Sequence, residues 1–431
     1  MKLAVAGPLL CEGKTKKVFV EDSDHVIIVS KDDLTAGDGA KHDVIEGKAK
    51  LANQTTCNVF RLLQQCGVPS AFIEQVGSER FRAKRCKMVP YEVVVRREAH
   101  GSYLKRNPHL QKGHVFPQLV TEFFLKTSGK RWESHVLPKD DPFTRIVGDC
   151  DKMELYLPDQ PIQTQKPFLV LEDFPAKTCA GFFQAAAEIA RKTFLVLEKA
   201  WQLQGRKLVD FKVEFGWDEK QEKLHLTDVI DNDSWRVVED GHYIDKQIYR
   251  DGASLNEVTA KYQLVAELTG RFGLPRQQII LWRGSDTDDL RPFYGALEEF
   301  DILGTTGIFR VVDVTLSAHK QPVQVCEQIT QLVQEVPDTV VIAYVGRSNG
   351  LGPILAAQVS VPVISVSSTW KQFPEDIWSS LHLPSSVPVA TILDPKNAVL
   401  YALQILAVGN PKLWAELRMK REPRLRNFVG L

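Results

Sequence analysis

Several features are scarce or absent in this chain of 431 residues, and each absence excludes a class of protein. Lysine plus arginine equals aspartate plus glutamate at 54 each, so the basic excess of a general nucleic-acid binder is missing. The seven cysteines are scattered without a CxxC pair, which disfavours zinc and redox sites and fits a reducing cytosol. No apolar run approaches the roughly 18 residues of a membrane helix. These absences predict a cytoplasmic protein that binds neither nucleic acid nor membrane.

The order of the predicted elements indicates domains of different fold class. At about 150 residues per domain, the length predicts two or three domains. Strand and helix patterns first follow one another without regular alternation, and the last of these helix patterns, 254–272, begins with Ser254 and Glu257 as a capping box. Beyond it, short β-branched runs alternate with helical stretches, which is typical of a parallel sheet covered on both faces. We therefore predict an α+β domain over 1–273 and a doubly wound α/β domain over 274–431.

Periodicity places several elements of the first domain. The segment 138–167 is rich in proline and aspartate and is predicted to be a long loop or an insertion. The predicted strands are 16–20, 25–30, 92–98 and 211–216, and the predicted helix is 182–201.

Three polar loops of the second domain follow the ends of predicted strands, where open α/β sheets bind ligands. The loop 283–289 contains a Gly-Ser turn that can offer backbone N–H groups and a hydroxyl to a phosphate. The loop 316–322 carries His319 and Lys320, and the glycine-rich loop 345–353 enters another helix. Each loop alone is more often a plain turn, but their gathering at one sheet edge favours a binding site.

Basic side chains cluster in two stretches of the first domain. Lys14 and Lys16 lie in a glycine-containing turn, where they are either surface charge or a flap that reaches nucleotide phosphates. The segment 93–108 joins a strand to Arg96, Ser102, Lys105 and Arg106. This composition suits an anionic substrate, and a charged solvent face is the alternative.

Acidic side chains gather on a strand and in the turn that follows it. Because side chains alternate along a strand, Asp210, Lys212 and Glu214 share one face. The stretch LTDVIDNDSWR (226–236) then adds a cluster of aspartates, which either sits in a solvated turn or holds a cation. Glu214 and Asp228 would supply the hard oxygen ligands that Mg²⁺ prefers, while other aspartates cap the turn.

Taken together, these motifs resemble two enzyme families of purine biosynthesis. The first domain resembles the phosphoribosylaminoimidazole-succinocarboxamide (SAICAR) synthetases in EGKTK (12–16), SKDDLTAGDGAKHDVIEGKA (30–49), GSYLKRNP (101–108), VDFKVEFG (209–216) and DVIDNDSWR (228–236). The second resembles the animal-type phosphoribosylaminoimidazole (AIR) carboxylases in GSDTD (284–288), SAHK (317–320) and GRSNGLGP (346–353). In this order, over nearly the whole chain, they resemble the animal-type bifunctional enzymes.

The resemblance implies the fold and the chemistry of both domains. It implies an ATP-grasp-related synthetase domain and a flavodoxin-like carboxylase domain. The carboxylase would add CO₂ to AIR without biotin, giving the carboxylated nucleotide CAIR. The synthetase would use ATP and Mg²⁺ to join CAIR to aspartate, giving SAICAR. A cytoplasmic homo-octamer is also implied.

The match to the family motifs further implies roles for individual residues. Catalytic roles fall to Lys212, Lys320 and His319, the last as a proton shuttle. In the synthetase domain the resemblance implies contacts to ATP by Lys14, Lys16, Met88 and Val89, contacts to CAIR by Arg96, Ser102, Asp210 and Arg236, a closing loop with Lys246 and Arg250, and Mg²⁺ binding by Glu214 and Asp228. In the carboxylase domain it implies substrate contacts by Ser285, Asp288, Arg347, Ser348, Asn349 and Gly350, the last three beside CO₂.

Two alternatives stay open. A diverged paralogue would ligate a different azole or amino acid and carry an altered or inactive carboxylase domain, and the segment 127–142 replaces the acidic stretch that the family associates with the amino-acid substrate. A non-catalytic homologue would serve as a binding or scaffold subunit. The presence of Lys212, Glu214, Asp228 and His319 disfavours the scaffold, since a scaffold has no need of them.

Overall fold

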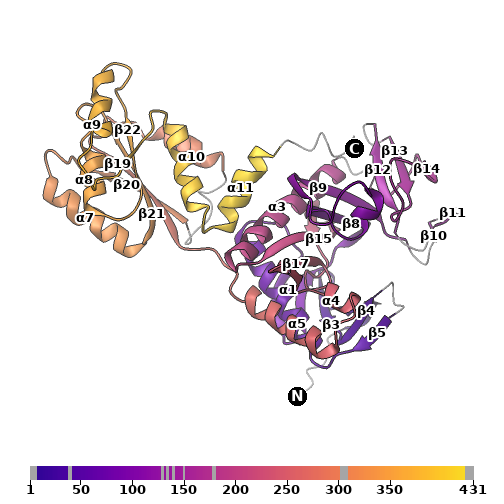
Figure 1. Ribbon diagram of the computed structural model, residues 1–431. Coiled ribbons are helices and arrows are strands. Elements are labelled where there is room, and N and C mark those ends of the chain that lie inside the picture. The colour runs from indigo at the N-terminus through magenta and orange to yellow at the C-terminus, as the bar shows by residue number, and fades with distance from the viewer. Residues whose placement is uncertain are drawn as a thin grey trace. The chain divides into compact units, whose positions relative to one another are not determined.

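The computed structural model divides into two compact units, which we call the first and the second unit (Figure 1). The first unit takes Met1–Gly273 and Arg418–Leu431, and the second takes Leu274–Leu417. The residues that the structure describes are 7–36, 41–127, 131–132, 135–137, 141–148, 151–176, 181–300 and 309–422. Among the described helices, none is long and apolar enough to cross a membrane.

A nine-stranded sheet forms the centre of the first unit, in the order β14-β13-β12-β9-β8-β15-β17-β18, with β16 also paired to β15. Its long central strands β8 and β15 are antiparallel, and the buried helix α3 packs against them. The strands are β8 (Lys87–Glu98), β9 (Val115–Leu125), β12 (Phe143–Val147), β13 (Lys152–Tyr156), β14 (Leu169–Leu171), β15 (Lys207–Asp218), β16 (Lys223–Leu226), β17 (Trp235–Glu239) and β18 (His242–Tyr243), and α3 is Phe182–Leu203.

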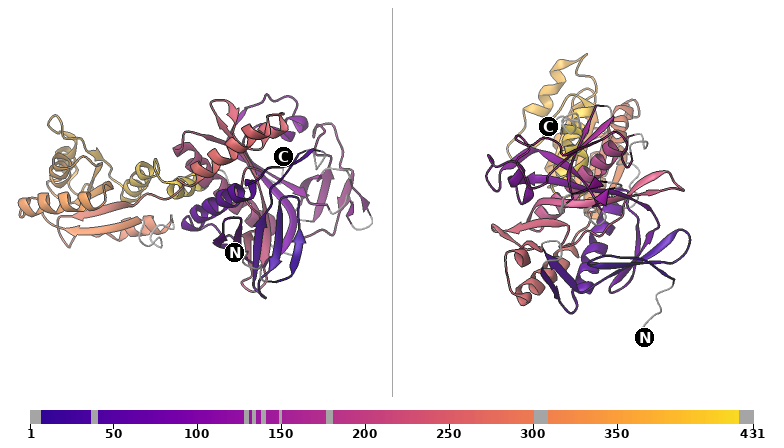
Figure 2. Two further views of the ribbon diagram at one scale, coloured as in Figure 1. Left: turned by 90° about the horizontal axis from the view of Figure 1, so that it is seen from below. Right: turned by 90° about the vertical axis from the view of Figure 1, so that its right-hand side faces the viewer.

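A second, five-stranded sheet of the first unit runs in the order β1-β2-β3-β7-β6, and Figure 2 shows it from two further directions. Helix α1 contacts β3, β6 and β7 of this sheet and also packs on α5. The elements are β1 (Leu9–Glu12), β2 (Lys16–Val20), β3 (His25–Ser30), β6 (Phe72–Gly77), β7 (Arg80–Lys84), α1 (Lys48–Gln65) and α5 (Leu255–Thr269). The smaller elements of the unit are the pair β4 (Asp33–Ala36) and β5 (Lys41–Val44), the pair β10 (Arg131–Trp132) and β11 (His135–Val136), and the helices α2 (Ser102–Arg106) and α4 (Gln247–Arg250).

The start of α5 confirms the predicted capping box. The Ser254 side chain accepts a hydrogen bond from the backbone N–H of Glu257, whose carboxylate accepts one from the Ser254 N–H at 2.9 Å. The helix ends at Thr269, three residues before the predicted end, because Gly270 and the residues after it close into turns.

Of the two alternatives predicted for 138–167, the long loop is wrong, because β12 and β13 lie within that segment. Alternate residues of this hairpin are buried, among them Ile146, Met153 and Leu155. An alternating apolar pattern stabilises a strand even where the flanking composition is typical of loops. The prolines of the segment lie outside the two strands.

The second unit is a five-stranded parallel sheet in the order β20-β19-β21-β22-β23, which confirms the predicted doubly wound α/β class. Ile279 and Leu281 pack on one face with α6 and α10, while Ile280 and Trp282 pack on the other with α7 and α8 (Figure 1). The elements are β19 (Gln277–Arg283), β20 (Phe309–Thr315), β21 (Asp338–Val345), β22 (Val363–Ser367), β23 (Ala390–Thr391), α6 (Arg291–Glu298), α7 (Pro322–Glu335), α8 (Leu351–Gln358), η2 (Pro374–Ile377), α9 (Trp378–Leu381), α10 (Pro395–Leu406) and α11 (Pro411–Arg421), of which α11 continues past Leu417 into residues of the first unit.

Candidate active sites

A cavity of about 360 Å³, here called the first cavity, opens on one face of β8 and β15. In the antiparallel register, Asp210 lies opposite Arg96 and Lys212 opposite Val94, so alternate residues of both strands point to the same side. The predicted face of the strand is therefore a cavity wall. The lining also includes Glu92, Ser102, Lys105, Phe124, Asp141, Asp159, Asp233, Ser234, Arg236 and Arg250.

A buried network of charges forms one end of the first cavity. The Asp210 carboxylate accepts from Arg96 at 2.6 Å and from Arg236 at 2.7 Å. Behind them, Glu122 accepts from Arg96 at 2.8 Å and from Arg106 at 2.6 Å. Three guanidinium groups thus face two carboxylates, and the surplus positive charge suits an anionic ligand.

Gly101 makes room for this network. Its φ of +56° lies in the region that favours glycine, and a Cβ there would collide with the guanidinium of Arg236. The glycine therefore lets the chain pass next to a side chain that lines the cavity.

Replacing Glu122 by glutamine should destabilise the first unit by about 3–5 kcal/mol at pH 7, because it leaves two buried arginines short of a partner. Burial alone would raise the pKa of Glu122, but the charges of Arg106 and Arg96 outweigh it and lower the pKa. Stability from this group is therefore present above the unfolded pKa of about 4.3 and is lost as the pH falls further. Urea unfolding measures the difference, which should shrink below about pH 4.

Glu74→Gln is the matched control, because Glu74 pairs with Arg82 on the surface at 2.5 Å and should contribute about 1 kcal/mol or less. Equal losses in the Glu122 and Glu74 variants would contradict a structural role for the buried network.

Lysines and carboxylates alternate at the other end of the cavity face. Lys212 Nζ donates to Glu92 at 2.7 Å, and Lys126 Nζ donates to Glu214 at 2.6 Å. Burial alone would lower the pKa of Lys212, but the Glu92 charge outweighs it and raises the pKa above the ordinary value. Lys212 is therefore protonated at neutral pH.

Glu214 and Asp228 lie on neighbouring segments, because Thr227, the residue before Asp228, donates its N–H to the Glu214 carbonyl at 3.1 Å. Lys16 pairs directly with Asp228. Burial lowers the pKa of Lys16 to about 8, against the opposing charge of Glu214. Each carboxylate thus pairs with a lysine ammonium group, Glu214 with Lys126 and Asp228 with Lys16. Carboxylate oxygens are the hard donors that a divalent cation such as Mg²⁺ prefers, so the two side chains fit that ion.

The aspartates of the 226–236 stretch divide into different roles. Asp231 is buried and Asp233 is half-buried, and both accept hydrogen bonds. Asp231 accepts from the Asp233 N–H at 2.9 Å, and Asp233 accepts from Lys246 at 2.7 Å and from Tyr262 at 2.8 Å. Burial raises the pKa of Asp231 to about 6, with Asp233 adding to the effect. These two acids stabilise the turn.

Of the remaining residues predicted for the first domain, some line the first cavity and others do not. Arg250 and Ser102 line the cavity, whereas Lys14 is exposed in the turn between β1 and β2. Met88 and Val89 lie in β8, where Met88 pairs with Gly216 of β15.

The second unit holds a cavity of about 320 Å³, here called the second cavity, where the three predicted loops meet. Ser285 and Asp288 come from the first loop, His319 from the second, and Arg347 and Ser348 from the third. Further lining residues are Gly284, Thr287, Ser317, Ala318, Val345, Gly346, Leu351 and Thr369. Parallel strands bring these loops to one sheet edge, as the sequence predicts.

Gly350 and Asn349 lie close to the histidine of this cavity. A Cβ at Gly350 would stand 3.6 Å from His319 Nε2, so backbone and imidazole are close neighbours. The Asn349 side chain is fully buried, and its amide atoms have no hydrogen-bond partner among the described residues. Lys320 is exposed beside His319 and is not part of the cavity lining.

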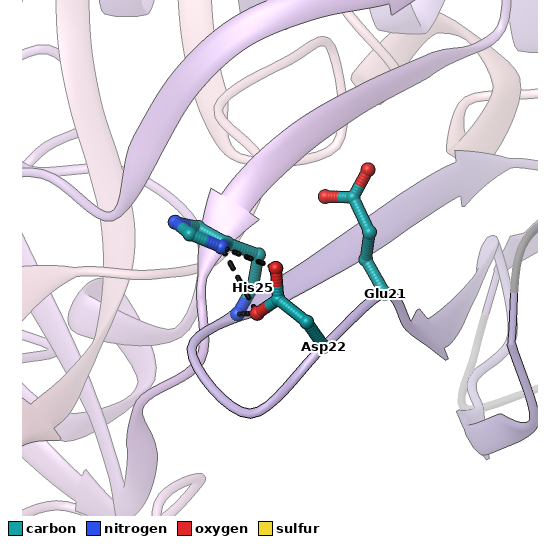
Figure 3. A group of neighbouring side chains, drawn as sticks. All are labelled: Glu21, Asp22 and His25. Carbon is teal, nitrogen blue, oxygen red and sulfur yellow. Dashed lines mark hydrogen bonds and ion pairs between the residues drawn. The ribbon is translucent and has the colours of Figure 1, made fainter.

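One further cluster of possible metal ligands, Glu21, Asp22 and His25, lies in the β2–β3 turn (Figure 3). His25 Nδ1 lies 2.8 Å from the Asp22 carboxylate. Glu21 accepts from Arg82 at 2.7 Å through each of its two oxygens. The three side chains therefore have partners within the protein, as is usual in a surface turn, and we do not interpret the cluster as a metal site.

Sequence reasoning missed several lining residues. Glu92 could have been found, because it lies two residues before Val94 and four before Arg96 on the same strand face. Thr369 follows the end of β22 and carries the same positional signal as the three predicted loops. Asp141 and Asp159 come from segments outside the central strands and gave no such signal.

Comparison with known proteins finds a separate family model for each part of the chain. The family model described as SAICAR synthetase matches residues 9–136 and 159–268, and the model described as AIR carboxylase matches 278–426. A Caenorhabditis elegans protein named "Probable multifunctional protein ADE2" is 36% identical over 420 residues, covering 93% of this chain and 90% of that protein. The human "Bifunctional phosphoribosylaminoimidazole carboxylase/phosphoribosylaminoimidazole succinocarboxamide synthetase" is 34% identical over 438 residues, covering 96% of this chain and 93% of the human protein.

A solved structure titled "SAICAR synthetase (Type-2) in complex with ADP" is 29% identical and covers 60% of this chain and 96% of its own, with a TM-score of 0.48. Both family models match in the order seen in the bifunctional relatives, and these relatives align over nearly their whole length. The chain therefore belongs to the family of bifunctional proteins that join a SAICAR synthetase domain to an AIR carboxylase domain.

Proposed function

We propose that this protein catalyses two consecutive steps of purine biosynthesis. The second unit carboxylates AIR with CO₂ to give CAIR, and the first unit joins CAIR to aspartate with ATP to give SAICAR. Family membership over nearly the whole chain supports the two activities. The observation that carries the proposal is that each matched unit has its own cavity, lined by the charged and polar residues that its step requires.

In the carboxylation step, the aminoimidazole ring is the nucleophile. Its carbon forms a bond to CO₂, and the proton on that carbon must leave to restore the aromatic ring. His319 lines the second cavity and is assigned to accept that proton. In this proposal Ser285 and Asp288 bind the ribose phosphate and hydroxyls, and the segment Ser348–Gly350 lines the pocket for CO₂. In this proposal the carboxylation uses no biotin.

In the ligation step, ATP converts the CAIR carboxylate to an acyl phosphate, and the aspartate amine then displaces phosphate to form the amide. Arg96 and Arg236 are assigned to CAIR, because they bring surplus positive charge to the first cavity. Lys212 is assigned to the transferring phosphoryl group, since its ammonium lines the same cavity.

In this proposal ATP and a divalent cation bind at the end of the strand face that lies away from the arginine network. Lys16 would approach the ATP phosphates, and Met88 and Val89 would face the adenine. Glu214 and Asp228 would hold Mg²⁺, whose charge offsets repulsion between the carboxylate and the triphosphate. Family resemblance further supports assembly as a homo-octamer in the cytoplasm.

A mass-spectrometric assay of the purified chain tests this function. One reaction contains AIR, bicarbonate, Mg-ATP and aspartate, and a parallel reaction contains CAIR in place of AIR. SAICAR is expected in both. SAICAR from CAIR alone would contradict the carboxylase assignment, and its absence from both would contradict the ligase assignment as well.

A further inference from the structure

A fourth polar loop reaches the second cavity, at residues 368–369. It follows β22, which pairs in parallel with β21, so the loop opens on the same sheet edge as the other three. Thr369 lines the cavity. The neighbouring Ser368 Oγ donates a hydrogen bond of 2.8 Å to the Asp288 Oδ1 atom of the first loop. The two loops are 80 residues apart in the sequence.

The backbone of Asp288 is fixed independently of Ser368. Its N–H donates to the Ser285 carbonyl at 3.1 Å, and its carbonyl accepts from Arg283 at 3.2 Å. Arg283 is itself held at the end of the sheet, because its Nε donates to Thr315 Oγ1 at 2.8 Å. What remains free at Asp288 is the rotation of its carboxylate, and the Ser368 hydrogen bond restricts that rotation.

Ser368 is itself fixed in a position that restricts rotation of the Asp288 carboxylate. Its own N–H donates to the Val345 carbonyl at 2.9 Å, which fixes the serine to the end of β21. A serine hydroxyl has one proton to donate, and here the Asp288 carboxylate accepts it. A hydrogen bond to an ionised acceptor is stronger than one between neutral groups. The Oδ2 atom of Asp288 can then accept from a ligand in a defined orientation.

We propose that Ser368 is a positioning residue of the carboxylase site: it orients the Asp288 carboxylate so that its Oδ2 atom accepts a hydrogen bond from a ribose hydroxyl of AIR. The inference rests on the proposed function, since it takes AIR as the ligand of the second cavity. Ser368 acts through Asp288 and takes no part in the chemical step.

Ser368→Ala should raise the KM for AIR about tenfold, the usual effect of losing a hydrogen bond to a charged group, while kcat changes little. The matched control is Ser367→Ala, which removes an adjacent buried hydroxyl that has no partner among the described residues. The control should keep the KM of the unaltered protein. Ser368→Thr, which retains the hydroxyl, should restore a KM well below that of the alanine variant. An unchanged KM in Ser368→Ala would overturn the proposal.

A double-mutant cycle separates positioning from general damage to the fold. If Ser368 acts through the carboxylate, Ser368→Ala should cost less kcat/KM in an Asp288→Asn background than in the unaltered protein. Equal costs in the two backgrounds would reject the coupling.

Ligation of supplied CAIR, measured on the same preparations, should be unchanged, because it depends on the first unit. If the unaltered protein does not carboxylate AIR, the proposed function fails. If it does, and Ser368→Ala equals the Ser367→Ala control, only the present inference fails.

Discussion

Asp228→Asn is expected to abolish the ATP-dependent ligation of CAIR while carboxylation of AIR continues at the normal rate. The substitution keeps the size of the side chain but removes the negative charge that pairs with Lys16 and is assigned to Mg²⁺. A hard divalent cation loses a charged oxygen donor, and Lys16 loses its partner. We expect ligation to fall by at least about 100-fold, in line with the several kcal/mol that charge stabilisation contributes to such steps.

The measurement is the rate of SAICAR formation from CAIR, with CAIR formation from AIR recorded on the same preparation. The matched control is Asp240→Asn, which alters an exposed acid in the turn between β17 and β18 and should leave both rates unchanged. A variant that retains ligation would remove Asp228 from the metal site. Loss of both activities would instead indicate damage to the whole chain.

His319→Ala is expected to have the opposite effect. Carboxylation should fall by about 10²–10⁴-fold, the usual contribution of a positioned acid–base group. Ligation of supplied CAIR should be unaffected, because His319 lies in the second unit and the ligation residues lie in the first. The rate of CAIR formation from AIR and bicarbonate measures the effect.

The matched control is His382→Ala, which removes a histidine of the same unit whose ring lies 5.1 Å from that of Trp378. It should keep carboxylation at its normal rate. If His319→Ala also carboxylated AIR normally, another group would have to accept the proton, and the assignment of His319 would be wrong.

The parts of the site that follow from local geometry could be predicted from the sequence. The alternation along β15 placed Asp210 and Lys212 on one face, because the pleat of a strand is a property of a few consecutive residues. The gathering of Ser285, His319 and Ser348 followed from a general rule for parallel sheets. In both cases the prediction required no knowledge of which segments pair.

The parts that depend on pairing between distant segments were missed. Glu122 of β9 joins Arg96 and Arg106 in the buried network only because β9 lies beside β8. Ser368 contacts Asp288 only because both loops end on one sheet edge. The β12–β13 hairpin lies in a segment whose proline and aspartate content favours a loop or an insertion. A single sequence does not reveal such partners.

The lysine–carboxylate pairs of the first unit have a consequence for how ligands enter. Lys16 with Asp228, Lys126 with Glu214, and Lys212 with Glu92 balance positive against negative charge before any substrate arrives. The carboxylates of these pairs are largely buried, so folding has already removed most of their surface from water. The entering cation would replace a lysine ammonium beside a carboxylate, and the triphosphate would replace a carboxylate beside a lysine. Binding would therefore exchange groups of the same sign and change the net charge of the site little.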